Sequence, residues 1–158
     1  MTRTVQTDIA IFGAGASGLS LALALADSGL TVALLDGAPR RPQGPDRSLA
    51  LSLGSSRVLS ALGVEFDDST CTAITQIRIS QADASGEVAL DGALLGEALL
   101  GQVLALDDLC TNLEQALEKC TRMSRVDIGA LRALDLSGGH LHLHGEQAVV
   151  QTRLLVGA

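Results

Sequence analysis

Aromatic side chains are nearly absent from this chain of 158 residues, which contains two Phe, no Trp and no Tyr. Basic residues are also few, because 11 Lys and Arg stand against 18 Asp and Glu and give a formal net charge of −7. Base stacking needs aromatic rings, and contact with a phosphate backbone needs positive charge. We therefore do not expect this protein to bind nucleic acid.

Cysteine and proline are scarce as well. Cys71, Cys110 and Cys120 form neither a CxxC pair nor an even set, which predicts buried free thiols in a reducing cytoplasm, with a reactive thiol as the alternative. All three prolines lie within residues 37–45, which predicts a surface loop. No targeting sequence is recognisable, and 47% hydrophobic residues predict one globular domain.

The most informative segment is residues 8–36. It reads Asp8-Ile-Ala-Ile-Phe-Gly13-Ala-Gly15-Ala-Ser-Gly18, then an alanine- and leucine-rich stretch, then Thr31-Val-Ala-Leu-Leu-Asp36. This order predicts a strand, a glycine turn, a helix and a second strand. Gly13 would permit the turn, Gly15 would let backbone approach a pyrophosphate, and Gly18 would let the helix pack closely.

Two further parts of this segment suit a dinucleotide. The first helical N–H groups, at Ala16 and Ser17, and the positive end of the helix dipole would face the phosphates. Asp36 ends the second strand 18 residues after Gly18, where its carboxylate would accept hydrogen bonds from ribose hydroxyls. Its charge argues against a 2′-phosphate, and so against NADP at this site.

Three alternatives apply to the same segment. One is a βαβ turn that binds no ligand. Another is a membrane span, because residues 9–26 carry no charge, but three glycines within six residues make a poor helix. A signal peptide is the third, although Arg3 is soon followed by Asp8 and the stretch continues into a strand. We expect a soluble segment.

The rest of the chain predicts alternating elements. A helix is expected at 55–62, a strand at 73–82 with a hairpin partner at 87–90, a strand at 101–106 and a helix at 107–120. A β-meander is expected at 125–128, 131–136 and 140–144, followed by a final strand at 149–156. His140, His142 and His144 share one face of their strand. They could bind a metal, but no carboxylate or cysteine accompanies them at suitable spacing, so we predict a polar outer face and no metal site.

Further blocks accompany the glycine motif: Asp46-Arg47-Ser-Leu-Ala-Leu-Ser52 with residues 55–63, the strand at 74–80, Leu100-Gly101-Gln102-Val103 before the 107–120 helix, and the closing Leu154-Leu155-Val156-Gly157-Ala158. With residues 8–36, they resemble the FAD-dependent aromatic hydroxylases. Among these, the likeness is to the 2-polyprenyl-6-methoxyphenol hydroxylase family of ubiquinone biosynthesis.

This resemblance implies an α/β fold, with a Rossmann-like βαβ FAD-binding unit, a parallel sheet and an added β-meander. Gly13, Gly15 and Gly18 would line the FAD pyrophosphate, and Asp36 would bind the adenosine ribose. Arg47 would reach toward the cofactor near the flavin, with a surface arginine as the alternative. Gln102 would contact FAD, with a strand-end glutamine of no special role as the alternative.

The same resemblance implies a flavin monooxygenase. In the family, NAD(P)H reduces the flavin, which then reacts with O₂ and hydroxylates a phenolic substrate. We expect a cytoplasmic protein, and the lipid-like substrate of the family implies association with the periphery of the inner membrane or with a biosynthetic complex as a further possibility.

The chain departs from the family at its end. In the family, Val-Gly-Ala is followed at once by Asp-Gly and much later by a Gly-Asp motif. This sequence stops at Ala158. We therefore interpret residues 1–158 as the N-terminal part of an FAD-binding domain, without the substrate domain and the C-terminal motifs. We nominate no catalytic residue, and we expect this chain to be inactive without the remainder of the enzyme.

Two other functions remain open. The chain could be a non-catalytic nucleotide-binding or interaction module. It could also belong to another flavin oxidoreductase with two dinucleotide folds, such as an amine oxidase. A disulfide reductase would need a CxxxxC pair after the first helix, which this sequence lacks.

Overall fold

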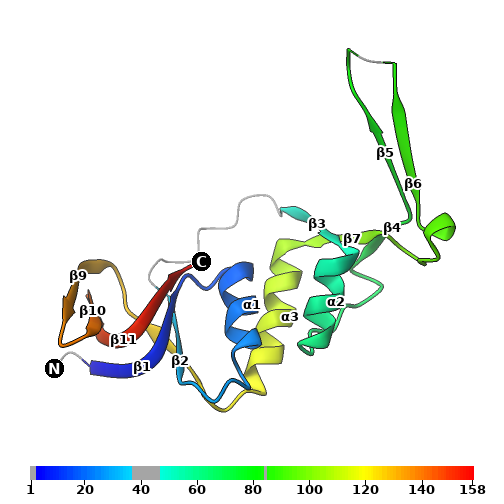
Figure 1. Ribbon diagram of the computed structural model, residues 1–158. Coiled ribbons are helices and arrows are strands. Elements are labelled where there is room, and N and C mark those ends of the chain that lie inside the picture. The colour runs from blue at the N-terminus through cyan, green and yellow to red at the C-terminus, as the bar shows by residue number, and fades with distance from the viewer. Residues whose placement is uncertain (1–2, 37–46, 84) are drawn as a thin grey trace. The chain divides into compact units, whose positions relative to one another are not determined.

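The computed structural model describes residues 3–36, 47–83 and 85–158 (Figure 1). The chain forms two compact units, one made of Met1–Pro45 with Cys110–Ala158 and the other of Asp46–Leu109. We call them the first and second units and describe each by itself. The proline-rich loop predicted at 37–45 and Asp46 lie outside the described residues.

The first unit opens with the predicted strand–turn–helix–strand. Strand β1 (Arg3–Phe12) leads into helix α1 (Ala16–Ala24), which is followed by β2 (Val32–Asp36). These strands join β8 (Met123–Asp127), β9 (Leu131–Ser137), β10 (His140–Gly145) and β11 (Ala148–Gly157) in one sheet. Its order is β8-β2-β1-β11-β10-β9, parallel from β8 to β11 and antiparallel from β11 to β9. The predicted α/β fold with a parallel sheet is confirmed.

Burial explains the apolar runs of β1 and β2. Strands in the parallel part of a sheet are covered on both faces and so are continuously hydrophobic. Four consecutive residues of β2 are buried, and α1 buries Gly18, Leu19, Ala22 and Leu23. The core cluster of the sheet consists of Ala10, Ala33, Leu35, Val126, Ile128, Leu143, Ala148 and Val150.

Helix α3 (Leu106–Glu118) fulfils the prediction of a helix from 107. Asp107 and Asp108 lie in its first turn, where the helix dipole favours negative charge. Leu109, Leu113 and Ala116 are buried at helical spacing. No described helix has both the length and the apolar character needed to cross a membrane.

The second unit is built around a small antiparallel sheet. Strands β3 (Ser48–Ser52), β7 (Gly101–Ala105) and β4 (Thr72–Ile74) pair in the order β3-β7-β4. Helix α2 (Leu53–Ala61) follows β3 directly, and the Ser52 hydroxyl caps it by accepting a hydrogen bond from the Ser55 N–H at 3.2 Å.

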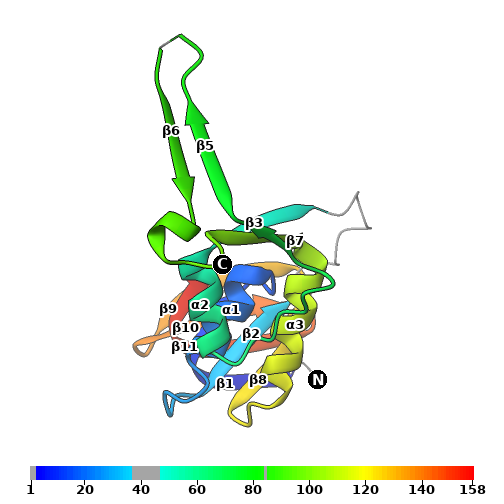
Figure 2. The ribbon, with the colours of Figure 1, turned by 90° about the vertical axis from the view of Figure 1, so that its right-hand side faces the viewer.

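A separate two-stranded ribbon also belongs to the second unit. Strands β5 (Gln76–Ser80) and β6 (Glu87–Asp91) pair only with each other among the described strands, and the short 3₁₀ helix η1 (Ala93–Leu95) follows β6. Both ribbon views show β5 and β6 projecting away from the β3–β7–β4 sheet (Figures 1 and 2).

The structure corrects three sequence-based expectations. Residues 125–128 are not part of the meander, because β8 pairs in parallel with β2, as a strand that follows a helix usually does. The strand expected at 73–82 is two strands of different sheets, interrupted at Thr75, whose carbonyl accepts a hydrogen bond from the Gly92 N–H. The three cysteines are free, but each is half-buried rather than buried.

Candidate functional site

The glycine turn and the acidic residue meet at one edge of the first unit's sheet. In the parallel pairing of β1 with β2, Phe12 lies opposite Leu35. The next residue, Gly13, donates its N–H to the Leu35 carbonyl at 3.2 Å, and Asp36 follows Leu35 directly. The carboxyl ends of parallel strands are where such sheets bind ligands.

Two of the three motif glycines are required by the packing of the protein itself. Gly13 has a φ of 124°, and a Cβ there would overlap the carbonyl oxygen of Ala158. Gly18 is buried in the first turn of α1, where a Cβ would overlap the carbonyl oxygen of Gly13. The helix can therefore lie close to the strand end only with glycine at both positions.

Gly15 is different, because nothing in the described protein requires a glycine there. It is the N-cap of α1, with a φ of −82° and a ψ of −176°, an extended conformation that any residue adopts. A Cβ at this position would meet no atom within 4 Å. The space beside Gly15 is open, which fits the close approach of a ligand.

The start of α1 offers unpaired donors toward the same space. The first helical hydrogen bond runs from the Leu19 N–H to the Gly15 carbonyl at 2.9 Å, so the N–H groups of Ala16, Ser17 and Gly18 precede it. No side chain caps this end, and no acidic residue lies in the first turn. A helix N-terminus of this kind favours an anion.

Asp36 is partly exposed and lies beside an arginine that sequence reasoning missed. Its carboxylate oxygen Oδ2 is 3.6 Å from the guanidinium of Arg125, which also contacts Glu114 Oε1 at 3.1 Å. An arginine in a short strand carries no recognisable signal, and its proximity to Asp36 arises only because β8 pairs with β2. The Asp36 carboxylate can accept hydrogen bonds from a ribose.

Arg47 and Gln102 belong to the second unit, whereas the glycine turn belongs to the first. Arg47 precedes β3, is exposed, and accepts a hydrogen bond on its carbonyl from the Leu106 N–H at 2.9 Å. Gln102 lies in β7 opposite Leu51 and is only 9% exposed. Neither position tests the predicted contact with a flavin.

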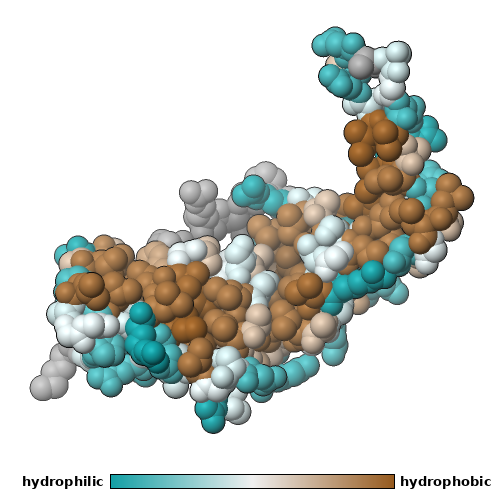
Figure 3. Space-filling model, in the orientation of Figure 1, coloured by the Kyte–Doolittle hydropathy of each residue, from teal (hydrophilic) through white to brown (hydrophobic). Residues whose placement is uncertain are grey.

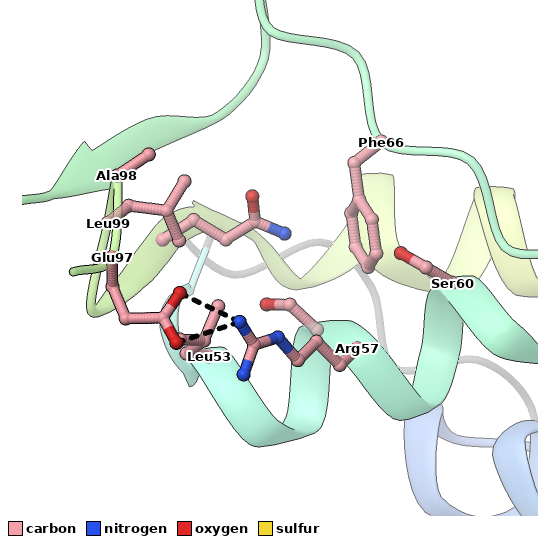
Figure 4. A pocket seen from close by; sticks show the side chains of 9 residues that line it. Leu53, Arg57, Ser60, Phe66, Glu97, Ala98 and Leu99 are labelled. Carbon is pink, nitrogen blue, oxygen red and sulfur yellow. Dashed lines mark hydrogen bonds and ion pairs between the residues drawn. The ribbon is translucent and has the colours of Figure 1, made fainter.

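Gln102 also lines a cavity of about 350 Å³ within the second unit. Figure 4 shows that Leu53 and Phe66 lie on opposite sides of this cavity, and that Arg57 and Glu97 form an ion pair beside it. The Arg57 guanidinium meets the two Glu97 oxygens at 2.7 and 2.9 Å. Ser56 Oγ and Gln102 Nε2 are buried and have no partner among the described atoms, so both could bond to a ligand or to water.

Strand β10, which carries His140, His142 and His144, has a carboxylate beside it that the spacing of residues in the sequence did not predict. His144 Nε2 lies 2.8 Å from Asp135 Oδ2 on the neighbouring strand, and the His142 and His144 rings stack with centroids 6.5 Å apart. Within residues 3–36, 47–83 and 85–158, no group of three or more His, Cys, Asp or Glu side chains could hold a metal ion.

An FAD diphosphate and adenosine ribose fit what the first unit offers. The open face of Gly15 leaves room for the diphosphate, the α1 N–H groups supply donors, and Asp36 supplies an acceptor at the same sheet edge.

Comparisons with known proteins agree with this reading of the fold. The family described as "FAD binding domain" matches residues 6–130. An uncharacterized protein of Synechocystis is 31% identical over 163 residues, which cover 97% of this chain and 38% of that protein. A probable 3-hydroxyacyl-CoA dehydrogenase of Deinococcus radiodurans is 29% identical, over 82% of this chain and 36% of that protein. The chain thus spans less than two fifths of these relatives.

Solved structures share the fold at low sequence identity. A p-nitrophenol 4-monooxygenase from Pseudomonas putida superposes with a TM-score of 0.73 at 16% identity, over 99% of this chain and 41% of that one. An anhydrotetracycline hydroxylase from Streptomyces rimosus gives 0.74 at 19% identity, over 98% and 32%. A geranylgeranyl bacteriochlorophyll reductase-like protein from Thermoplasma acidophilum gives 0.68 at 17% identity, over 98% and 39%.

Proposed function

Because the chain belongs to the FAD binding domain family, we propose that it holds the adenosine diphosphate half of FAD in a flavin-dependent monooxygenase. The observation that carries the proposal is Gly15, a glycine with open space beside it at an uncapped helix N-terminus. Gly13 and Gly18 have reasons within the protein to be glycine, whereas the reason at Gly15 is a ligand.

Each residue of the site has a distinct task in this proposal. Gly15 leaves room for the diphosphate, and the N–H groups of Ala16, Ser17 and Gly18 donate hydrogen bonds to its oxygens. Asp36 accepts hydrogen bonds from the ribose hydroxyls. Gly13 and Gly18 keep the turn and the helix close together, so that these donors lie at the sheet edge.

The family resemblance assigns the binding of the flavin half of FAD to residues of the second unit. We propose that Arg47 and Gln102 contact FAD there, since a fixed cation suits a phosphate or a flavin that becomes negatively charged. The unpartnered amide of Gln102 is compatible with such a contact. The reaction itself would be supplied by FAD, which accepts electrons from NAD(P)H and activates O₂.

For the complete enzyme we propose a phenolic substrate, of the polyprenyl-phenol type used in ubiquinone biosynthesis. Support comes from the sequence blocks that resemble that hydroxylase family and, more broadly, from the p-nitrophenol monooxygenase among the structural neighbours. The relatives are more than twice as long as this chain, so substrate binding would involve polypeptide beyond residues 1–158. A lipid-like substrate would favour peripheral association with a membrane.

A second candidate is a flavin oxidoreductase that does not insert oxygen. It is favoured by the reductase-like structural neighbour and by the dehydrogenase name of one relative. Oxygen consumption separates the two in a complete protein, because a monooxygenase consumes O₂ when a phenol is added. A reductase instead oxidises its electron donor in the absence of O₂ and passes the electrons to its organic substrate.

Calorimetric titration of the purified chain with ADP and with FAD tests the adenosine site. We expect both ligands to bind, and the Asp36→Ala variant to bind about 1–3 kcal/mol more weakly, as for a lost hydrogen bond to a charged group. Asp27→Ala, which removes an exposed carboxylate after α1, is the matched control and should leave the affinity unchanged. Equal affinities of the wild type and the Asp36→Ala variant would contradict the assignment.

A further inference from the structure

We propose that Arg125 is a positioning residue of the adenosine site, which orients the Asp36 carboxylate toward the ribose and offsets its negative charge. This inference rests on the proposed binding of adenosine diphosphate by the first unit. It adds a residue of β8 to a site otherwise made of β1, α1 and β2.

The pairing of β8 with β2 places Arg125 next to Asp36. In the parallel register Arg125 lies opposite Leu34, two residues before Asp36, and so on the same face of the sheet. Its side chain extends toward the carboxyl end of β2, where the guanidinium reaches Asp36 Oδ2 at 3.6 Å. This distance is that of an ion pair rather than a hydrogen bond.

Glu114 holds the guanidinium in place. Both terminal nitrogens of Arg125 donate hydrogen bonds to Glu114 Oε1, each at 3.1 Å. A planar guanidinium that makes two bonds to one acceptor has little freedom to turn. Arg125 is therefore anchored to α3 and presents its remaining surface to Asp36.

Orientation follows from which oxygen of Asp36 faces the arginine. Oδ2 is the Asp36 oxygen that comes closest to the Arg125 guanidinium, at 3.6 Å. The Asp36 side chain keeps 35% of its surface exposed. We infer that Arg125 holds this oxygen and leaves the other for a ligand, an arrangement that suits a pair of ribose hydroxyls.

Charge gives Arg125 a second task. Asp36, Glu114 and Asp127 are all close to this sheet edge, since Asp127 pairs with Asp36 in the strand register. A diphosphate adds further negative charge, in a chain whose net charge is already −7. A guanidinium between the Asp36 and Glu114 carboxylates reduces this repulsion.

The test compares ADP with 2′-deoxy-ADP, because only a correctly oriented Asp36 can sense the 2′-hydroxyl. We expect the wild-type chain to prefer ADP by about tenfold, the equivalent of one hydrogen bond to a charged group. Arg125→Ala should weaken ADP binding and reduce this preference to about twofold or less. Arg125→Lys keeps the charge but not the planar fork, and should recover part of the affinity with little of the preference.

Arg132→Ala is the matched control, since Arg132 forms a similar exposed ion pair with Glu146 at 2.6 Å on β9. Arg132→Ala should change neither the affinity for ADP nor the preference for ADP over 2′-deoxy-ADP. An Arg125→Ala chain that melts earlier but keeps its affinities and the tenfold preference would show a purely structural arginine and overturn the inference. An equal loss of affinity for both ligands would leave only the charge effect and overturn the orienting role. A wild-type chain that binds neither nucleotide would overturn the adenosine site itself.

Discussion

Glycines that look equivalent in a motif have different physical reasons. At Gly13 and Gly18 a side chain would collide with backbone carbonyls, of Ala158 and of Gly13 respectively. At Gly15 there is no such collision, and the backbone angles suit any residue. A substitution at Gly15 should therefore affect ligand binding, whereas a substitution at Gly13 or Gly18 should affect folding.

Gly15→Val should leave the fold intact and abolish binding of FAD and ADP. The valine side chain has room in the free protein but occupies the space that we assign to the diphosphate. The free energy of unfolding, measured by thermal denaturation, should change by less than about 1 kcal/mol. Calorimetry should detect no nucleotide binding. Retained affinity would show that no ligand lies close to this glycine.

Gly18→Ala is predicted to have the opposite profile. The added methyl group would overlap the Gly13 carbonyl, and overpacking of this kind costs about 1–3 kcal/mol. Chemical denaturation should show the loss without any ligand present. A variant as stable as the wild type would mean that α1 can move away from the turn at little cost.

A hydrogen-bonded pair that joins β1 to the residue before β2 carries a pH dependence. The Asp8 carboxylate on β1 accepts hydrogen bonds from the Thr31 N–H at 2.9 Å and the Thr31 hydroxyl at 2.8 Å, just before β2. These bonds, with a smaller contribution from Arg153, lower the pKa of Asp8 below 3.8. The stabilisation is therefore present above about pH 4, the unfolded pKa of an aspartate, and is lost as the pH falls through the folded pKa.

Asp8→Asn should remove this part of the acid sensitivity. The variant should be less stable than the wild type at pH 7, and the difference should narrow as the pH falls below about 4. Urea denaturation at a series of pH values measures both the difference in stability at pH 7 and its decrease at lower pH. Asp27→Asn serves as the control, and a constant difference between Asp8→Asn and the wild type at every pH would contradict the explanation.

The β5–β6 ribbon has two unlike faces. The register puts Ile77 opposite Leu90 and Ile79 opposite Val88, and these side chains are 37–57% exposed. On the other face Gln76 bonds to Asp91 at 2.7 Å. Figure 3 shows brown atoms along much of the ribbon. A two-stranded ribbon is only marginally stable by itself, so its apolar face is a weak point of the isolated chain.

Replacing Ile79 and Val88 by Thr should reduce the binding of the fluorescent dye ANS, which adsorbs to exposed apolar surface. Threonine keeps the strand preference, so the ribbon should persist. The matched control replaces Arg78 and Ser80, on the other face, by Thr, and should leave dye binding as it is. Equal fluorescence of the two double variants would show that the dye binds elsewhere.

At the scale of the molecule, the two ends of the chain build the centre of the first unit. Strand β11 pairs in parallel with β1 over its whole length, from Arg3 opposite Ala148 to Phe12 opposite Gly157. The buried Thr152 hydroxyl donates a hydrogen bond to the Asp8 carbonyl at 3.1 Å. The last strand is therefore an internal strand between β1 and β10 and not an edge.

Val150→Ala should accordingly destabilise the first unit by about 2 kcal/mol. Val150 is fully buried in the core of the sheet, so the substitution leaves a cavity. Leu154→Ala on the same strand removes a side chain that is 51% exposed and should cost less than about 1 kcal/mol. Equal losses of stability in the Val150→Ala and Leu154→Ala variants, measured by thermal unfolding, would show that β11 is not an internal strand.

The sequence by itself determined the local elements of this protein. Asp8 to Asp36 predicted β1, α1 and β2, because apolar periodicity and glycine positions are local properties of the chain. It also predicted the candidate site as far as Gly13, Gly15, Gly18 and Asp36, since these residues lie within one βαβ unit.

Tertiary structure decided which strands are neighbours. Only pairing placed β8 beside β2 and β11 beside β1, and so brought Arg125 to Asp36 and Ala158 to Gly13. It also divided residues 73–82 between two sheets and set Asp135 beside His144. The physical reason is that such contacts join residues far apart in the chain, and their free energy depends on the packing of the whole sheet rather than on local preference.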